Sequence, residues 1–97
     1  MQKRPEVAII ILNWNNWKDT IECIESLKNG SYSNYKLIIV DNASSNNSAE
    51  IIKNRFPECI LIKNSTNIGF AEGNNAGIRY AINNLNPQYI LLINNDT

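Results

Sequence analysis

Leu37-Ile38-Ile39-Val40-Asp41-Asn42 is the stretch of sequence that decides the fold. Its four apolar residues, mostly β-branched, predict a strand buried on both faces, as in parallel sheets. The strand ends abruptly at a carboxylate and an amide. Ligands of open α/β sheets bind beyond the carboxyl ends of the strands, so we expect Asp41 to face a binding crevice and to avoid burial in the core.

Two other apolar runs end in the same way. Residues 9–12 lead into Asn13, and residues 90–93 lead into Asn94, Asn95 and Asp96. Because the carboxyl ends of parallel strands meet at one edge of a sheet, these three polar ends predict a single polar site.

The rest of the chain alternates between strand and helix patterns. Apolar residues at 17, 21, 24 and 27 form a helical stripe, and Pro57 and Pro87 follow two further helical segments. The expected strands are residues 7–12, 37–42, 59–62 and 89–93, and the expected helices are 17–27, 49–56 and 69–85. This order predicts an α/β fold with a Rossmann-like, doubly wound, mostly parallel sheet (β-α-β-α-β-α-β) of strand order 3-2-1-4.

Small residues recur every four positions in the third expected helix, at Gly73, Gly77 and Ala81. Each glycine costs a helix about 1 kcal/mol relative to alanine, so a compensating role is expected. One reading is close packing of the helix on the sheet. The other is a surface on which a ligand approaches the helix backbone.

Composition narrows the function classes. Nine basic and nine acidic residues give a net charge of zero, which argues against nucleic acid as the main partner. No apolar run is long enough for a membrane span or a secretory signal, so a cytoplasmic protein is expected.

Cys23 and Cys59 lack metal-ligand spacing and are expected to be reduced thiols that are not bonded to each other.

The chemistry is narrowed further by motifs that the sequence lacks. There is no histidine, no G-x-G-x-x-G after the first strand and no P-loop, which argues against Ser-His-Asp catalysis, dinucleotide oxidoreductases and P-loop NTPases. Asn94 and Asp96 are two residues apart, so on an extended chain they point the same way. The amide oxygen of Asn94 and the carboxylate of Asp96 are ligands that suit Mg²⁺ or Mn²⁺, and such an ion can also bind the phosphates of a substrate.

The chain resembles the N-terminal, nucleotide-binding half of a family-two glycosyltransferase with the GT-A fold. Four stretches carry the resemblance: IIILNWN at 9–15, IVDNAS at 39–44, NIGFAEGNNAGI at 67–78 and LLINNDT at 91–97. The subgroup is similar to rhamnosyl- and galactofuranosyltransferases, which build cell-surface polysaccharides. Residues 1–97 are accordingly expected to be a truncated GT-A domain, with no helix after the last strand to cover the sheet.

The resemblance implies a role for each matching residue. Trp14 packs against the nucleotide base, and Asp41 with Asn42 reads a uracil or thymine base. Asn94 and Asp96 match the metal-binding D-x-D motif for Mg²⁺ or Mn²⁺. The implied nucleotide-sugar-binding set is Asn13, Trp14, Asn15, Asp41, Asn42, Asn67, Gly69, Asn75 and Asn94.

Two positions depart from the family pattern. Asn94 replaces the first Asp of the metal motif, and Asn74 stands where many relatives carry Arg near the diphosphate. The catalytic base is expected in a second half of the domain, so no catalytic residue is assigned here and the isolated 97 residues are expected to be inactive.

The expected activity is therefore metal-assisted, inverting transfer of a sugar from a UDP- or dTDP-linked donor to a saccharide or lipid-linked acceptor. The expected location is the cytoplasm, at the inner face of the membrane in the full-length protein, with self-association through the uncovered face. Two alternatives stay open: a non-catalytic nucleotide-binding α/β module, and a sugar-1-phosphate nucleotidyltransferase-like domain. The latter needs a Gly-rich, Arg-containing loop after the first strand, and residues 13–16 do not form one.

Overall fold

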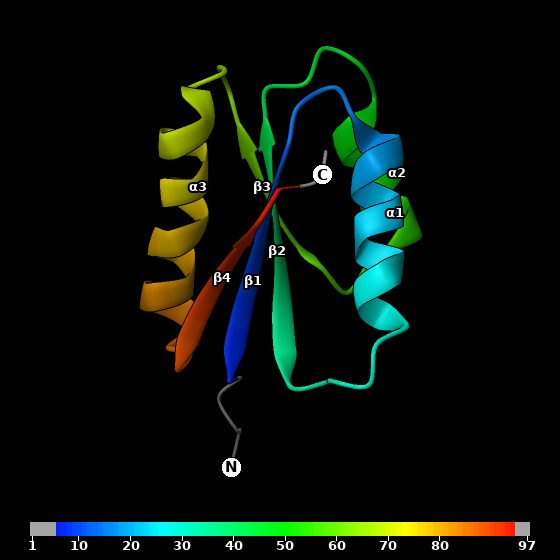
Figure 1. The fold of residues 1–97 in the computed structure, drawn as a ribbon. Coiled ribbons are helices and arrows are strands. Elements are labelled where there is room, and N and C mark those ends of the chain that lie inside the picture. The colour runs from blue at the N-terminus through cyan, green and yellow to red at the C-terminus, as the bar shows by residue number, and fades with distance from the viewer. Residues whose placement is uncertain (1–5, 95–97) are drawn as a thin grey trace.

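The computed structural model of the chain describes residues 6–94. Four parallel strands form one sheet in the order β3-β2-β1-β4 (Figure 1). The strands are β1 (Val7–Asn13), β2 (Tyr35–Asn42), β3 (Ile60–Asn64) and β4 (Tyr89–Ile93). The predicted α/β class, the strand order 3-2-1-4 and the parallel pairing of the first and fourth strands are confirmed.

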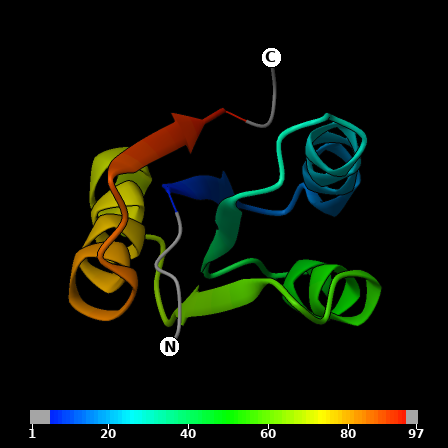
Figure 2. The ribbon, with the colours of Figure 1, turned by 90° about the horizontal axis from the view of Figure 1, so that it is seen from below.

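Helices cover the two faces of the sheet. α1 (Trp17–Lys28) and α2 (Ser48–Arg55) lie on one face, and α3 (Gly69–Tyr80) lies on the other, as the view along the sheet in Figure 2 shows. α3 continues into η1 (Ala81–Leu85), a π-helical segment. Each connection carries the chain from one strand through a helix to a parallel strand, so all four carboxyl ends lie at the same edge of the sheet.

The alternation of side chains along β1 divides the core in two. Ile9 and Ile11 pack with Ile24 and Ile52 on the side of α1 and α2. Ala8 and Ile10 pack with residues of β2 and α3 on the other side. Both sets are 5 % exposed or less, which is the burial that the continuous apolar runs predict.

The row of small residues on α3 is explained by close packing. A Cβ added at Gly77 would lie 2.8 Å from Ile10 Cγ2 and 3.1 Å from Val40 Cγ2. A Cβ at Gly73 would lie 2.6 Å from Leu12 Cδ1. Both glycines are buried against the sheet, so a ligand does not approach α3 from this side.

The ends of most elements differ by one or two residues from the sequence-based expectation, and β2, for example, begins at Tyr35. α2 begins at Ser48 and β3 at Ile60, each one residue away from the expected start. The expected single helix over residues 69–85 changes to π-helical geometry at Ala81, where the N–H of Asn86 donates to the carbonyl of Ala81. Asn86 then takes a left-handed conformation with φ 49° before Pro87, which ends the helix.

β4 is an edge strand of the described sheet and is less covered than the central strands. Tyr89 is 65 % exposed, and Leu91 and Leu92, which point to opposite faces, are each 47 % exposed. Among residues 6–94, no helix has the length and the apolar composition of a membrane-spanning segment.

Candidate functional site

The candidate site lies where β1 and β2 end side by side. Asn13 and Asp41 are register partners, so their side chains leave neighbouring strands at the same level. Three connections follow these ends and the end of β3, at residues 14–16, 43–47 and 65–68. This places at one edge of the sheet the polar residues at the ends of β1 and β2 that the sequence predicts to act together.

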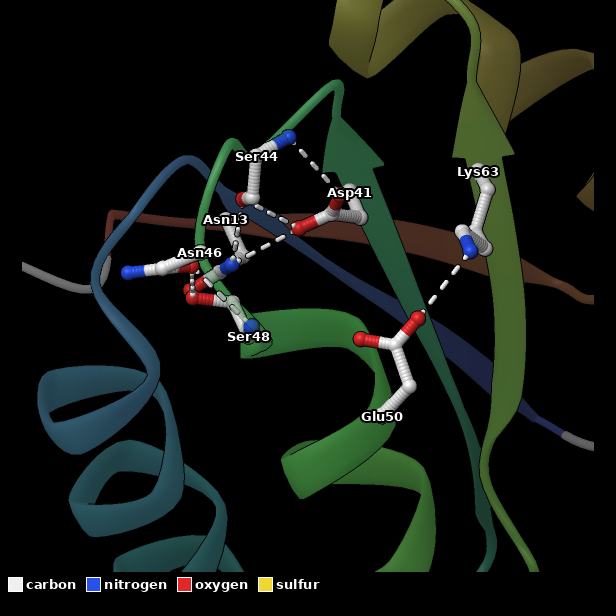
Figure 3. Close-up of polar contacts among 7 residues, drawn as sticks. All are labelled: Asn13, Asp41, Ser44, Asn46, Ser48, Glu50 and Lys63. Atoms are coloured by element: carbon white, nitrogen blue, oxygen red, sulfur yellow. Dashed lines mark hydrogen bonds and ion pairs between the residues drawn. The ribbon is translucent and has the colours of Figure 1, made fainter.

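Asp41 is the centre of a hydrogen-bond network at this edge (Figure 3). Its Oδ1 accepts hydrogen bonds from Asn13 Nδ2 at 2.9 Å and from Ser44 Oγ at 2.6 Å. Its Oδ2 accepts one from the backbone N–H of Ser44 at 3.1 Å. The carboxylate therefore closes the turn after β2 and joins it to β1.

Asn13 extends the network towards α1. It is 0 % exposed, and its Oδ1 accepts a 2.6 Å hydrogen bond from the hydroxyl of Thr20. Burial of an amide and a carboxylate is tolerable because both are bonded, and every buried side-chain nitrogen or oxygen of the described residues has a partner. The network thus fixes the first turn of α1 relative to both strands.

Asn15 joins the two loops above the strands. It has φ 52°, a left-handed conformation that Asn accepts more readily than most residues. Its Oδ1 accepts the backbone N–H of Ser45 at 2.7 Å and that of Asn46 at 3.3 Å. Trp14, which precedes it, is 55 % exposed, so its ring is available to a ligand.

Asn42 makes a second network, towards β3 and α3. Its Nδ2 donates to Asn67 Oδ1 at 3.0 Å and to the carbonyl of Gly69 at 3.1 Å. Its Oδ1 accepts from Asn64 Nδ2 and from the backbone N–H of Ile68, both at 3.2 Å. Gly69, with φ 85°, then begins α3. The family resemblance implies that Asn42 reads the base together with Asp41. In the structure, its side-chain amide is instead hydrogen-bonded to the segment between β3 and α3.

The surroundings of Asp41 correct one expectation. The sequence places this carboxylate facing a crevice, but the residue is only 2 % exposed and is bonded to its own turn. The physical reason is Ser44, whose N–H and hydroxyl satisfy the carboxylate locally. The D-x-x-S spacing at 41–44 is the signal that indicates such a turn. Sequence reasoning assigned no role to Ser44, Thr20 or Asn64.

The other predicted residues are more dispersed. Asn75 lies on α3 and donates to Glu72 of the same helix at 3.3 Å. Asn94, just after β4, lines a groove of about 420 Å³ with residues of α1, including Asp19 and Glu22. Asp96, the predicted anionic metal ligand, is outside the described residues. Within residues 6–94, no three His, Cys, Asp or Glu side chains are grouped to hold a metal ion.

The charges near the site are few. Glu50, in the first turn of α2, is exposed and forms an ion pair with Lys63 at the end of β3, at 3.3 Å (Figure 3). A hydrogen bond to its own backbone lowers the pKa of Glu50 most, and the hydrogen bond to Lys63 lowers it further. Because charged side chains are few, the described site offers a ligand mainly hydrogen bonds and the aromatic surface of Trp14.

Comparison with known proteins places these features in a family. The sequence profile described as "Glycosyl transferase family 2" matches residues 8–97. A curated hexosyltransferase of low-salt glycan biosynthesis, Agl10 of Haloferax volcanii, is 30 % identical over 91 residues, which are 94 % of this chain and 28 % of the relative. Glycosyltransferase GlyG of Streptococcus pneumoniae is 27 % identical over 96 residues, 93 % of this chain and 30 % of the relative. The chain thus spans less than a third of the length of these relatives.

Solved structures share the fold. S. aureus TarS (residues 1–349) superposes with a TM-score of 0.79 at 17 % identity, covering 94 % of this chain and 27 % of that chain. The mannosyltransferase PcManGT of Pyrobaculum calidifontis, solved with GDP-Man and Mn²⁺, gives a TM-score of 0.68 at 21 % identity, covering 82 % of this chain and 25 % of that one. At these identities the likeness concerns the fold alone.

Proposed function

Because the chain belongs to glycosyl transferase family 2, we propose that residues 1–97 form the nucleotide-sugar-binding portion of a glycosyltransferase. The full protein transfers a sugar from a nucleotide-diphosphate sugar to a saccharide or lipid-linked acceptor, with inversion at the sugar carbon. The observation that carries this proposal is the family match over residues 8–97, which includes all three polar strand ends.

Trp14 and Asp41 form the proposed base pocket. Trp14 offers a ring that is 55 % exposed. Asp41 Oδ2 accepts only the Ser44 N–H among the described residues, so it retains capacity to accept the N3–H of uracil or thymine. Since Asp41 is 2 % exposed, we expect this contact to require a small displacement of the loop over residues 43–47.

Asn94 and Asp96 are the proposed holders of a divalent cation. Their amide and carboxylate oxygens have the donor chemistry that Mg²⁺ and Mn²⁺ prefer, and Asn94 lies at a strand end on the site's edge of the sheet. When bound, such an ion neutralises diphosphate charge. The relative PcManGT, solved with GDP-Man and Mn²⁺, supports this choice.

The proposed donor carries UDP or dTDP, and the proposed sugar is a hexose or a rhamnose-like deoxyhexose. The carboxylate of Asp41 can accept the N3–H of uracil or thymine, a proton that cytosine lacks, and this favours UDP- and dTDP-linked donors. Support for a role in glycan synthesis comes from the relative Agl10, a hexosyltransferase of glycan biosynthesis.

Titration calorimetry of the 97-residue chain tests the proposal. UDP should bind weakly, and Mn²⁺ and UDP should strengthen each other's binding by the same factor. Asp96→Ala should remove the metal dependence, and Asn94→Asp should increase it by adding a second anionic ligand. Asp41→Ala should weaken binding with or without metal.

The matched control is Glu58→Ala, which removes an exposed carboxylate that pairs with Lys28 before the start of β3 and leaves the proposed base pocket and metal ligands in place. GDP provides a comparison with a purine nucleotide. Metal-independent affinity, tighter binding of GDP, or sugar transfer by the 97 residues would contradict the assignment. Nucleotide binding by a full-length protein that transfers no sugar would favour the non-catalytic module.

A further inference from the structure

We propose that Asn42 is a positioning residue, which holds the loop over residues 64–69 and the start of α3 in place for the donor and does not itself contact the nucleotide. This inference rests on the proposed function, and it assigns Asn42 a role different from the base reading that the resemblance implies.

The amide of Asn42 has no hydrogen-bonding capacity left for a ligand. An asparagine side chain has two N–H donors and two acceptor lone pairs. Asn42 donates to Asn67 Oδ1 and to the carbonyl of Gly69, and it accepts from Asn64 Nδ2 and from the N–H of Ile68. A ligand could bond to it only by displacing one of these partners.

Two of the partners are backbone groups, and they fix the orientation of the amide. The carbonyl of Gly69 can only accept, so it requires the nitrogen of Asn42, and the N–H of Ile68 can only donate, so it requires the oxygen. Asn42 is 2 % exposed, which further separates it from solvent and ligands.

All four partners lie in one segment, which runs from the end of β3 to the first residue of α3. Within it, Asn67 Oδ1 also accepts the N–H of Gly69 at 2.9 Å, so Asn67 joins Asn42 to the helix start. The contact continues into the helix, because a Cβ at Gly73 would lie 3.2 Å from Asn42 Nδ2. Asn42 therefore determines where Asn67 and Gly69, two proposed donor-binding residues, are held.

The decisive variant is Asn42→Asp, studied in the full chain. This variant keeps the shape of the side chain and the acceptor oxygen with its two lone pairs. It replaces the amide nitrogen, with its two N–H donors, by a carboxylate oxygen that faces the carbonyl of Gly69 and Asn67 Oδ1. We expect hydrogen exchange of the Ile68 and Gly69 amides to accelerate about tenfold or more, while exchange of the Ile38 amide in β2 changes little. The Kd for UDP with Mn²⁺ should rise by about tenfold.

Two further variants keep the test decisive. Asn64→Ala removes one of the four bonds and should cause smaller changes in the same direction. Ile52→Val destabilises the opposite core, away from the loop, and should leave the exchange of Ile68 and Gly69 and the nucleotide Kd unchanged.

Unchanged exchange of Ile68 and Gly69 in Asn42→Asp would overturn the proposal. Weaker nucleotide binding without faster exchange would also overturn it, because it indicates direct contact, as would faster exchange with unchanged affinity. If the unmodified chain binds no nucleotide, the proposed function fails, but the exchange rates still decide whether Asn42 holds the loop.

Discussion

The side-chain amide of Asn13 donates a 2.9 Å hydrogen bond to the carboxylate of Asp41, and the two residues are register partners at the ends of β1 and β2. Both are at most 2 % exposed. The bond joins two central strands at the point where the candidate site begins, so these residues contribute to stability as well as to the proposed binding of a base.

Asp41→Ala should therefore lower the free energy of unfolding, by about 2–4 kcal/mol, because it leaves the buried donors of Asn13 and Ser44 with poorer partners. Asp41→Asn should cost less, since it retains one acceptor oxygen. Urea unfolding followed by circular dichroism measures both values. An Asp41→Ala protein as stable as the parent would show that water satisfies these groups.

Gly77→Ala should destabilise the chain by up to about 2 kcal/mol, because overpacking costs about 1–3 kcal/mol and the gain in helix propensity returns about 1 kcal/mol. The added Cβ would lie 2.8 Å from Ile10 Cγ2 in the buried sheet. Gly30→Ala is the matched control, since Gly30 is exposed and its Cβ would meet only the Leu27 carbonyl, at 3.3 Å. A stabilising Gly77→Ala would contradict close packing as the reason for this glycine.

Ala43→Gly should stabilise the chain by about 0.5–1 kcal/mol. Ala43 has φ 62°, in the turn that Asp41 closes, and a left-handed conformation costs a residue with a Cβ about 1–2 kcal/mol. The flexibility of glycine in the unfolded chain offsets part of this gain. Ala71→Gly, at an exposed position of α3, should instead destabilise. Thermal unfolding of both variants checks the opposite signs.

Stability should fall as the pH rises above 9. Burial raises the pKa of the Cys59 thiol from its ordinary value of 9.0, and burial likewise raises that of Cys23. The folded state therefore holds these protons at a pH where the unfolded chain releases them. The stabilisation is complete below pH 9 and is lost as the pH approaches the folded pKa. Cys59→Ala should flatten this decline, as urea midpoints between pH 8 and 10 would show.

The two thiols should also be free. Both cysteines are unpaired in the structure, where Cys59 is buried and Cys23 is half-buried. Thiol titration of denatured, unreduced protein should return two thiols per chain. In the folded protein Cys23 should react first, and simultaneous reaction of both would argue against burial of Cys59.

The 97-residue chain should self-associate through β4. Leu91 and Leu92 are each 47 % exposed on an edge strand, and exposed apolar edges promote pairing between molecules. Leu92→Lys should reduce association, because a charge opposes edge pairing. Sedimentation velocity over a wide concentration range measures the effect, with Ile82→Lys, a 60 % exposed position on η1, as the control. A parent chain that stays monomeric at high concentration would exclude this interface.

The sequence by itself determined the architecture. Apolar runs that end in polar residues, separated by helical periodicity, predict buried parallel strands, and the rule for crossover connections leaves few strand orders. The same runs locate the site, because polar residues directly after buried strands must gather at one edge of the sheet. These are properties of local pattern and chain connectivity, and both are read from the sequence.

Only the tertiary structure decided what each polar residue does there. The roles of Asp41 and Asn42 depend on partners such as Asn13 and Gly69, which are 28 and 27 residues away along the chain. Hydrogen bonds require atoms to meet within about 3 Å, and residue spacing does not fix such distances between segments that are remote in sequence. For the same reason, only the fold showed that Gly77 is needed for packing against Ile10.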